Sequence, residues 1–176
     1  MHASITAVGV DRPGVVAAVT SVLFDVGANI EDSRMAILGG HFSMMLMVSL
    51  PDGVGVEPLE RALAVPAERL DLIVAVRPAT GAPTGHAEGD EYVVSVYGAD
   101  KPGIVAKISA VLAAQRVNIR DLATHIVEGP TFVYVMLLEV TLPVDANPAA
   151  IESELVGSAR ELGVEVSIHP SEPETL

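Results

Sequence analysis

The chain has 176 residues and a formal net charge of −13, which arises from 23 acidic residues and 10 lysines and arginines. Because phosphate neutralisation by basic side chains dominates nucleic-acid affinity, this balance argues against direct binding to DNA or RNA. Hydrophobic residues make up 50% of the chain and aromatic residues only 3%, which predicts an aliphatic core. The absence of cysteine excludes disulfides, thiol nucleophiles and thiolate metal sites.

The chain shows no sign of a targeting or membrane-spanning segment. The start lacks the pattern of a signal peptide, and polar residues interrupt each apolar run before it reaches membrane-spanning length, so we expect a cytoplasmic protein without a membrane partner. The five histidines lack the paired spacing of metal ligands, and no serine has a nearby histidine and aspartate signature. We therefore expect no metal, no cofactor and no hydrolytic triad.

The first secondary-structure elements are a strand and a helix. Ser4–Val10 is apolar enough for a strand, and Pro13 follows at a position where a helix can begin. Asp11 precedes it and is a candidate side-chain acceptor for the free N–H groups of that helix. One helical face is then formed by Val15, Val19, Val22, Leu23 and Val26, and Gly27 ends the helix.

A hairpin, a second helix and a closing strand follow. Ala28–Leu38 and His41–Leu50 are predicted strands that flank Gly39-Gly40, a strong hairpin signal. A short helical face comes next, at Val56, Leu59, Ala62 and Leu63, and then an alternating strand, at Leu70, Leu72, Val74 and Val76. The predicted order is strand, helix, strand, strand, helix, strand.

The second half of the chain repeats the first. Asp11-Arg12-Pro13-Gly14 returns as Asp100-Lys101-Pro102-Gly103, a shift of 89 residues that also places Asn118 at the position of Asn29. The repeated elements are predicted as strand Tyr92–Tyr97, helix Pro102–Gln115, strands Asn118–Val127 and Phe132–Leu142, helix Ala149–Leu162 and strand Val164–His169. Self-similarity of this length indicates a duplicated domain.

The repeat and the composition together predict the domain organisation. We expect domains at residues 1–77 and 91–170, a flexible linker rich in proline and glycine at 78–90, and an acidic tail at 171–176. The element order predicts an α+β fold in which each domain is a ferredoxin-like βαββαβ unit, with two helices on one face of an antiparallel sheet.

The hairpin strands are apolar on both faces. Phe42, Met44, Leu46, Val48 and Leu50 alternate with Met45 and Met47, and the second copy repeats this pattern over Phe132–Leu142. An antiparallel strand with one wet face would alternate with polar residues instead. We therefore expect another sheet or another chain to cover the face without helices, and a homodimer.

The repeated polar residues suit a zwitterionic ligand. A loop that ends at a helix N-terminus offers N–H groups and partial positive charge to a carboxylate, and Gly14 leaves room for it. Asp11 can face an ammonium group, and the Asn29 amide carries both a donor and an acceptor. The candidate residues of both copies are Asp11, Pro13, Gly14, Asn29, Asp100, Pro102, Gly103 and Asn118. The same residue types also serve as caps and turns, so a purely structural role is the alternative.

Two segments of each half resemble the ACT domain, a small ligand-sensing module. They are Asp11-Arg12-Pro13-Gly14-Val15-Val16 with Gly27-Ala28-Asn29-Ile30-Glu31-Asp32, and Asp100-Lys101-Pro102-Gly103-Ile104-Val105 with Val117-Asn118-Ile119-Arg120-Asp121. Within that family, two tandem units without an enzyme domain resemble the glycine cleavage system transcriptional repressor group.

The resemblance implies a ferredoxin-like fold, side-by-side pairing of ACT units and binding of an amino-acid effector at the seam between them. It implies further that Asp11, Pro13 and Gly14 face Asn118, whereas Asp100, Pro102 and Gly103 face Asn29. The second copy departs from the family pattern in one place, where Arg116-Val117-Asn118 stands for Gly27-Ala28-Asn29.

Three functions remain open at this point. The first is a sensor that binds a small amino acid and signals to a protein partner, such as a transcription factor or an enzyme. The second is a small enzyme, because the fold alone does not exclude catalysis. The third is an interaction or regulatory subunit without a ligand of its own. Thermal melts with each amino acid separate them, since only a sensor gains stability without turnover.

Overall fold

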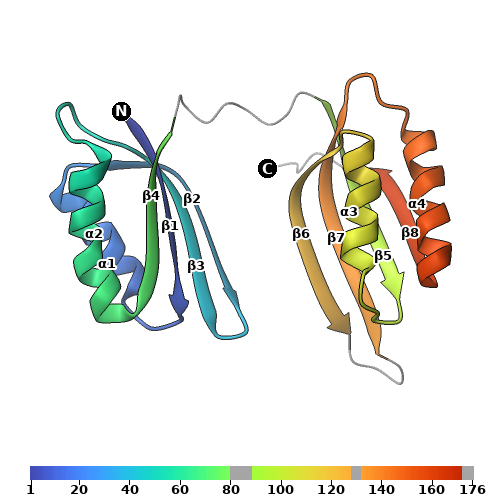
Figure 1. Ribbon diagram of the computed structural model, residues 1–176, viewed down its shortest axis with the longest axis horizontal. Coiled ribbons are helices and arrows are strands. Elements are labelled where there is room, and N and C mark those ends of the chain that lie inside the picture. The colour runs from blue at the N-terminus through green and yellow to red at the C-terminus, as the bar shows by residue number, and fades with distance from the viewer. Residues whose placement is uncertain (80–88, 128–131, 172–176) are drawn as a thin grey trace. The chain divides into compact units, whose positions relative to one another are not determined.

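The computed structural model describes residues 1–79, 89–127 and 132–171 of the chain. The chain divides into two compact units, Met1–Thr84 and Gly85–Leu176. Each unit has a four-stranded antiparallel sheet with two helices on one face (Figure 1). The predicted α+β class and the ferredoxin-like βαββαβ order are confirmed in both units.

The two units contain the same elements in the same order. The first consists of β1 (His2–Val10), α1 (Val15–Asp25), β2 (Asn29–Leu38), β3 (His41–Ser49), α2 (Val56–Leu70) and β4 (Leu72–Ala79). The second consists of β5 (Gly89–Gly98), α3 (Ile104–Ala114), β6 (Asn118–Val127), β7 (Val133–Pro143), α4 (Pro148–Leu162) and β8 (Val164–Pro170). Their sheet orders are β2-β3-β1-β4 and β6-β7-β5-β8, so β2 and β6 are edge strands.

The predicted hairpin is present and its turn has the expected geometry. Gly39 and Gly40 have φ values of 57° and 77°, and positive φ at both central residues is the signature of the tight hairpin turn. Regular structure enters the predicted linker at both ends, because β4 continues to Ala79 and β5 begins at Gly89. The centre of the linker, 80–88, and the tail from 172 on lie outside the described residues.

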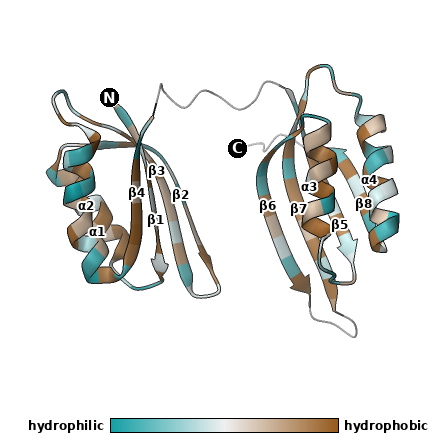
Figure 2. Cartoon of the chain, in the orientation of Figure 1, coloured by the Kyte–Doolittle hydropathy of each residue, from teal (hydrophilic) through white to brown (hydrophobic). Residues whose placement is uncertain are grey.

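The helix-covered face of each sheet forms the core. Phe42, Met44, Leu46, Val48 and Leu50 are each at most 5% exposed, as their alternation predicts. The neighbouring Met45 points to the face without helices and is 55% exposed. The edge strands β2 and β6 differ from the inner strands, since both begin with a hydrophilic stretch and end with hydrophobic residues (Figure 2).

No helix within the described ranges is both long and apolar enough to cross a bilayer.

Candidate functional site

The loop before the first helix has the same backbone in both units. Gly14 and Gly103 have φ values of 94° and 96° with ψ of −4° in each, a left-handed conformation that favours glycine. The N–H of Val15 donates to the carbonyl of Arg12, at 3.3 Å, which closes a turn ahead of α1. The chain therefore needs glycine here for its turn, and the turn leads directly into the helix.

The prediction that Asp11 caps the helix is wrong. The residue at the N-cap is Gly14, and no side chain caps α1; the same holds for Gly103 and α3. The turn through Pro13 and Gly14 moves Asp11 out of reach, and α1 begins at Val15 rather than at Pro13. As a result, no side chain accepts from the first N–H groups of either helix, and a Cβ placed on Gly14 or Gly103 would meet no atom beyond its chain neighbours within 4 Å.

The two halves of the candidate site lie at opposite ends of each sheet. In the first unit Asn29 pairs with Ser49, which pairs with His2 at the start of β1. The loop of Gly14 follows Val10 at the other end of β1, eight residues from His2 or about 26 Å along the strand. A single unit therefore does not bring Asn29 together with Asp11, Pro13 and Gly14.

The second unit repeats this separation. Asn118 pairs with Thr141, which pairs with Glu91 near the start of β5. Gly98, at the opposite end of β5, leads into the loop of Asp100, Pro102 and Gly103. Each unit thus presents a helix N-terminus at one end of its sheet and an asparagine at the other.

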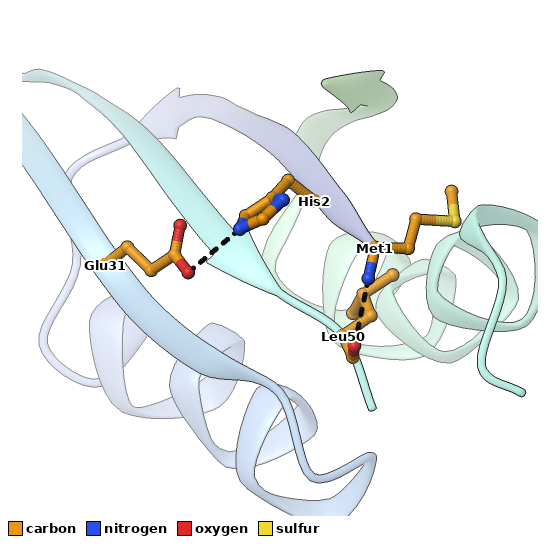
Figure 3. Close-up of polar contacts among 4 residues, drawn as sticks. All are labelled: Met1, His2, Glu31 and Leu50. Atoms are coloured by element: carbon orange, nitrogen blue, oxygen red, sulfur yellow. Dashed lines mark hydrogen bonds and ion pairs between the residues drawn. The ribbon is translucent and has the colours of Figure 1, made fainter. Parts of the chain in front are cut away.

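A β-bulge follows each asparagine, and the bulged residue bonds to a side chain across the sheet. In β2 the register shifts between Ile30 and Asp32, so Glu31 is the extra residue. Its Oε1 lies 3.1 Å from Nε2 of His2 (Figure 3). The bond runs across β3 and joins the edge strand to β1.

The corresponding residue in β6 is Arg120, and its charge is opposite. Its guanidinium bonds to Glu91 and lies 3.6 Å from a carboxylate oxygen of Glu139. Arg120 occupies the position of Glu31, and Glu91 that of His2, at the same 89-residue shift. These pairs were not predicted from the sequence. A signal for them was present at two matched positions of the repeat, where His2 and Glu31 of the first unit become Glu91 and Arg120 of the second.

The family comparison confirms the duplication. The family model for the ACT domain matches residues 2–77 and 91–169, which together include every element of both units except their outermost residues. The chain belongs to the ACT domain family. It is built from two ACT units.

Known proteins are similar to nearly the whole of this chain. The chain is 30% identical to the glycine cleavage system transcriptional repressor of Escherichia coli over 168 residues, 94% of this chain and 87% of that protein. A solved structure of an unknown protein from Galdieria sulphuraria is 29% identical with a TM-score of 0.82, covering 97% of this chain and 98% of that chain. A putative glycine cleavage system transcriptional repressor is 25% identical with a TM-score of 0.69, covering 96% and 95%.

The second ACT unit keeps the helix-end turn although it lacks the glycine of the first. Gly27 has a φ of 73° and Arg116 a φ of 57°, so both occupy the left-handed region. The N–H of Gly27 donates to Phe24, and that of Arg116 to Ala113, each at 3.0 Å. The departure of Arg116 from the family pattern therefore leaves the backbone ahead of Asn118 unchanged.

Arg116→Gly is expected to raise the stability of the second ACT unit by up to about 1 kcal/mol, because a left-handed arginine carries strain that glycine avoids. The change also removes the ion pair of Arg116 with Asp145, at 2.8 Å. That pair lowers the pKa of Asp145 through a hydrogen bond and then through charge, so it stabilises the fold above the unfolded pKa and is lost on acidification.

Thermal melts at high salt, where the exposed pair is screened, isolate the backbone gain. Asp145→Asn is the matched control, because it removes the pair and keeps the strain. An Arg116→Gly protein that melts lower than Asp145→Asn at high salt would contradict this account.

The loop of the second ACT unit also influences a buried tyrosine. Tyr134, on β7, is 8% exposed. Burial raises the pKa of its hydroxyl, and the nearby Asp100 carboxylate raises it further. The Asp100 carboxylate therefore acts on the hydroxyl of Tyr134 in the same unit.

The outer surface of the first ACT unit has a groove between α1 and α2. Its volume is about 580 Å³, and Gly14 and Ala18 line it together with Val65 and Arg69. In the second unit polar pairs join the equivalent helices, Lys107 to Glu161 and Gln115 to Glu154, each at 2.9 Å. The groove does not reach Asn29, and no group of residues in the described parts of the chain has the composition of a metal site.

Proposed function

We propose that this chain is a non-enzymatic regulatory protein of amino-acid metabolism. It binds a small amino acid at sites that each combine the loop of one ACT unit with the asparagine of another, and it signals to a protein partner in the cytoplasm. One observation carries the proposal: each unit holds the two halves of the motif at opposite ends of its sheet, so a single unit does not combine them in one site.

The chemistry of the two halves fits a zwitterion. The uncapped start of α1 or α3 offers N–H groups to a carboxylate, and Gly14 or Gly103 leaves the approach open. Asp11 or Asp100 supplies a carboxylate for the ammonium group. The amide of Asn29 or Asn118 can donate and accept at once, which matches a ligand with both charges.

The relatives and the charge favour regulation through a protein. The similar protein of Escherichia coli is named the glycine cleavage system transcriptional repressor, and this name supports a role in the control of amino-acid metabolism. A net charge of −13 opposes contact with DNA, so we propose that a transcription factor or an enzyme receives the signal. Glycine is the first ligand to test.

Thermal melts of the full chain with glycine and each other amino acid test the proposal. A ligand present at about 100 times its dissociation constant adds ~2.7 kcal/mol, which raises the melting temperature by several degrees. Stabilisation by one amino acid without turnover supports the sensor. A chain that no amino acid stabilises would be an interaction subunit, and consumption of the amino acid would identify an enzyme.

We also propose that a second copy of the chain covers the open face of the sheet. On this face Val8 is 37%, Met45 55% and Ile73 77% exposed. Val8 pairs with Ile73, so these apolar side chains are neighbours on one surface. Contiguous apolar patches of this kind are uncommon on monomeric proteins.

Met45→Glu is expected to convert the proposed dimer into a monomer, because the dimer interface would bury the new carboxylate without a partner. Light scattering at micromolar concentration measures the mass, and circular dichroism is expected to be unchanged because Met45 lies outside the core. Arg77→Glu, at the rim of the same face, is the matched charge control. A wild-type chain that is monomeric at this concentration would refute the proposal.

A further inference from the structure

The asparagine of each ACT unit belongs to a row of residues that crosses three strands. Residues that pair directly across an antiparallel sheet point to the same face, so the members of a row are neighbours on one surface. The rows are Asn29, Ser49 and His2 in the first unit, and Asn118, Thr141 and Glu91 in the second.

The bulge residue bonds to the far end of the same row. Glu31 bonds to His2, and Arg120 bonds to Glu91. Each bond therefore passes over the middle strand, two residues along the chain from the asparagine. The two pairs have the same place in the fold and opposite polarity, since the acid lies on the edge strand in one unit and on the inner strand in the other.

A bulge needs such a restraint because its extra residue lies outside the hydrogen-bond ladder. In the second unit, the position of the restraining side chain costs free energy, because two polar atoms are buried without a partner in the described part of the chain. The Arg120 side chain is 18% exposed, and its Nε and the hydroxyl of Thr141 are buried without a hydrogen-bond partner among the described residues. Both atoms would gain water if Arg120 moved away, so its carboxylate partners keep it in place.

We propose that His2–Glu31 and Arg120–Glu91 are positioning pairs that hold the bulges and thereby orient Asn29 and Asn118 toward the ligand. The inference rests on the ligand role proposed for the asparagines.

Other charged groups surround His2. Asp32 follows the bulge on β2, and Arg77 lies on β4 diagonally across from His2. The middle strand contributes the uncharged Ser49. The amino group of Met1 donates to the carbonyl of Leu50 at 3.4 Å (Figure 3).

Side-chain amide signals in nuclear magnetic resonance spectra of the ligand-free full chain test the inference. Asn29, Asn118 and Asn147 are the asparagines of the chain and Gln115 is its glutamine, so four amide signals need assignment. We expect a variant that breaks one pair to displace the signal of the asparagine in the same unit, while the signal of Asn147 stays constant. Asn147 is a built-in reference, since its side chain caps α4.

Three variants decide the outcome. Glu31→Gln and His2→Gln are each expected to displace the Asn29 signal alone, and Glu91→Gln to displace the Asn118 signal alone. Glu161→Gln, which breaks the exposed pair with Lys107, is the matched control and is expected to change neither.

An Asn29 signal that stays unchanged in both His2→Gln and Glu31→Gln, or an Asn118 signal that stays unchanged in Glu91→Gln, overturns the inference. Because the spectra are recorded without ligand, this result is separate from the failure of the proposed function. That failure would be the absence of binding by glycine or any other amino acid to a chain in which the asparagines do follow their positioning pairs.

Discussion

Asn29→Ala is expected to weaken amino-acid binding at one of the sites by about tenfold to a hundredfold, and Asn118→Ala to do the same at the other. A hydrogen bond to a charged group contributes about 1.5–3 kcal/mol, which corresponds to that change in affinity. The ligand-free melting temperature is expected to stay nearly constant, because both asparagines are exposed. Isothermal titration calorimetry of the full chain measures the two affinities.

Asn147→Ala is the matched control for this experiment. The Asn147 side chain accepts bonds from the N–H groups of Ala149 and Ala150, at 3.1 and 3.3 Å, and so caps α4. Its loss is expected to cost about 1 kcal/mol of stability with no effect on ligand affinity. Binding that survives both Asn29→Ala and Asn118→Ala would show that these asparagines only form turns.

Gly14→Val is a less direct probe of the same site. A Cβ added at Gly14 meets no protein atom within 4 Å, so the valine side chain would block only the ligand. However, Gly14 has a φ of 94°, which a β-branched residue adopts only with strain. A loss of binding in this variant would therefore combine blocking with a distorted loop, which is why the asparagine variants decide the question.

Leu46→Ala is expected to destabilise the first ACT unit by about 2–5 kcal/mol, because it leaves a cavity in a closely packed core. Leu46 lies on the helix-covered face of β3 and is 2% exposed. For a unit of this size the loss lowers the melting temperature by roughly 10 °C or more. Differential scanning calorimetry of the full chain measures the change.

The adjacent Met45 provides the control. It lies on the same strand but on the open face, with 55% of its surface exposed. In dilute protein, where chains are separate, Met45→Ala is expected to change stability by less than about 0.5 kcal/mol. Equal losses for the two variants in dilute solution would mean that the two faces of β3 are buried alike, against the architecture described above.

The elements and their order were predictable from the sequence. The alternation around Leu46 and the glycine pair Gly39-Gly40 define the hairpin, because a strand that buries one face and a turn with two positive φ values leave few other choices. The duplication doubled this information, since each element appears twice. The candidate residues themselves were also read from the repeat.

The roles of some of these residues were not predictable. Asp11 has the residue type and position of a helix cap, but the turn through Gly14 moves it away from the first helical turn. Arg116 looks like a break in the pattern, yet it adopts the left-handed conformation that Gly27 adopts. Both outcomes depend on backbone dihedral angles that several residue types can occupy, and residue type alone does not specify them.

The amino-acid sequence by itself determined the fold class, the duplication and the residues of the candidate site, because these follow from local periodicity, turn chemistry and repetition. Only the tertiary structure decided which of those residues lie together. The register of β1, β3 and β2 places Asn29 in one row with Ser49 and His2, at the end of the sheet away from Gly14. The bulge brings the Glu31 side chain into contact with His2, 29 residues earlier in the chain. Strand pairing sets such distances, and it joins positions that no spacing along the chain relates.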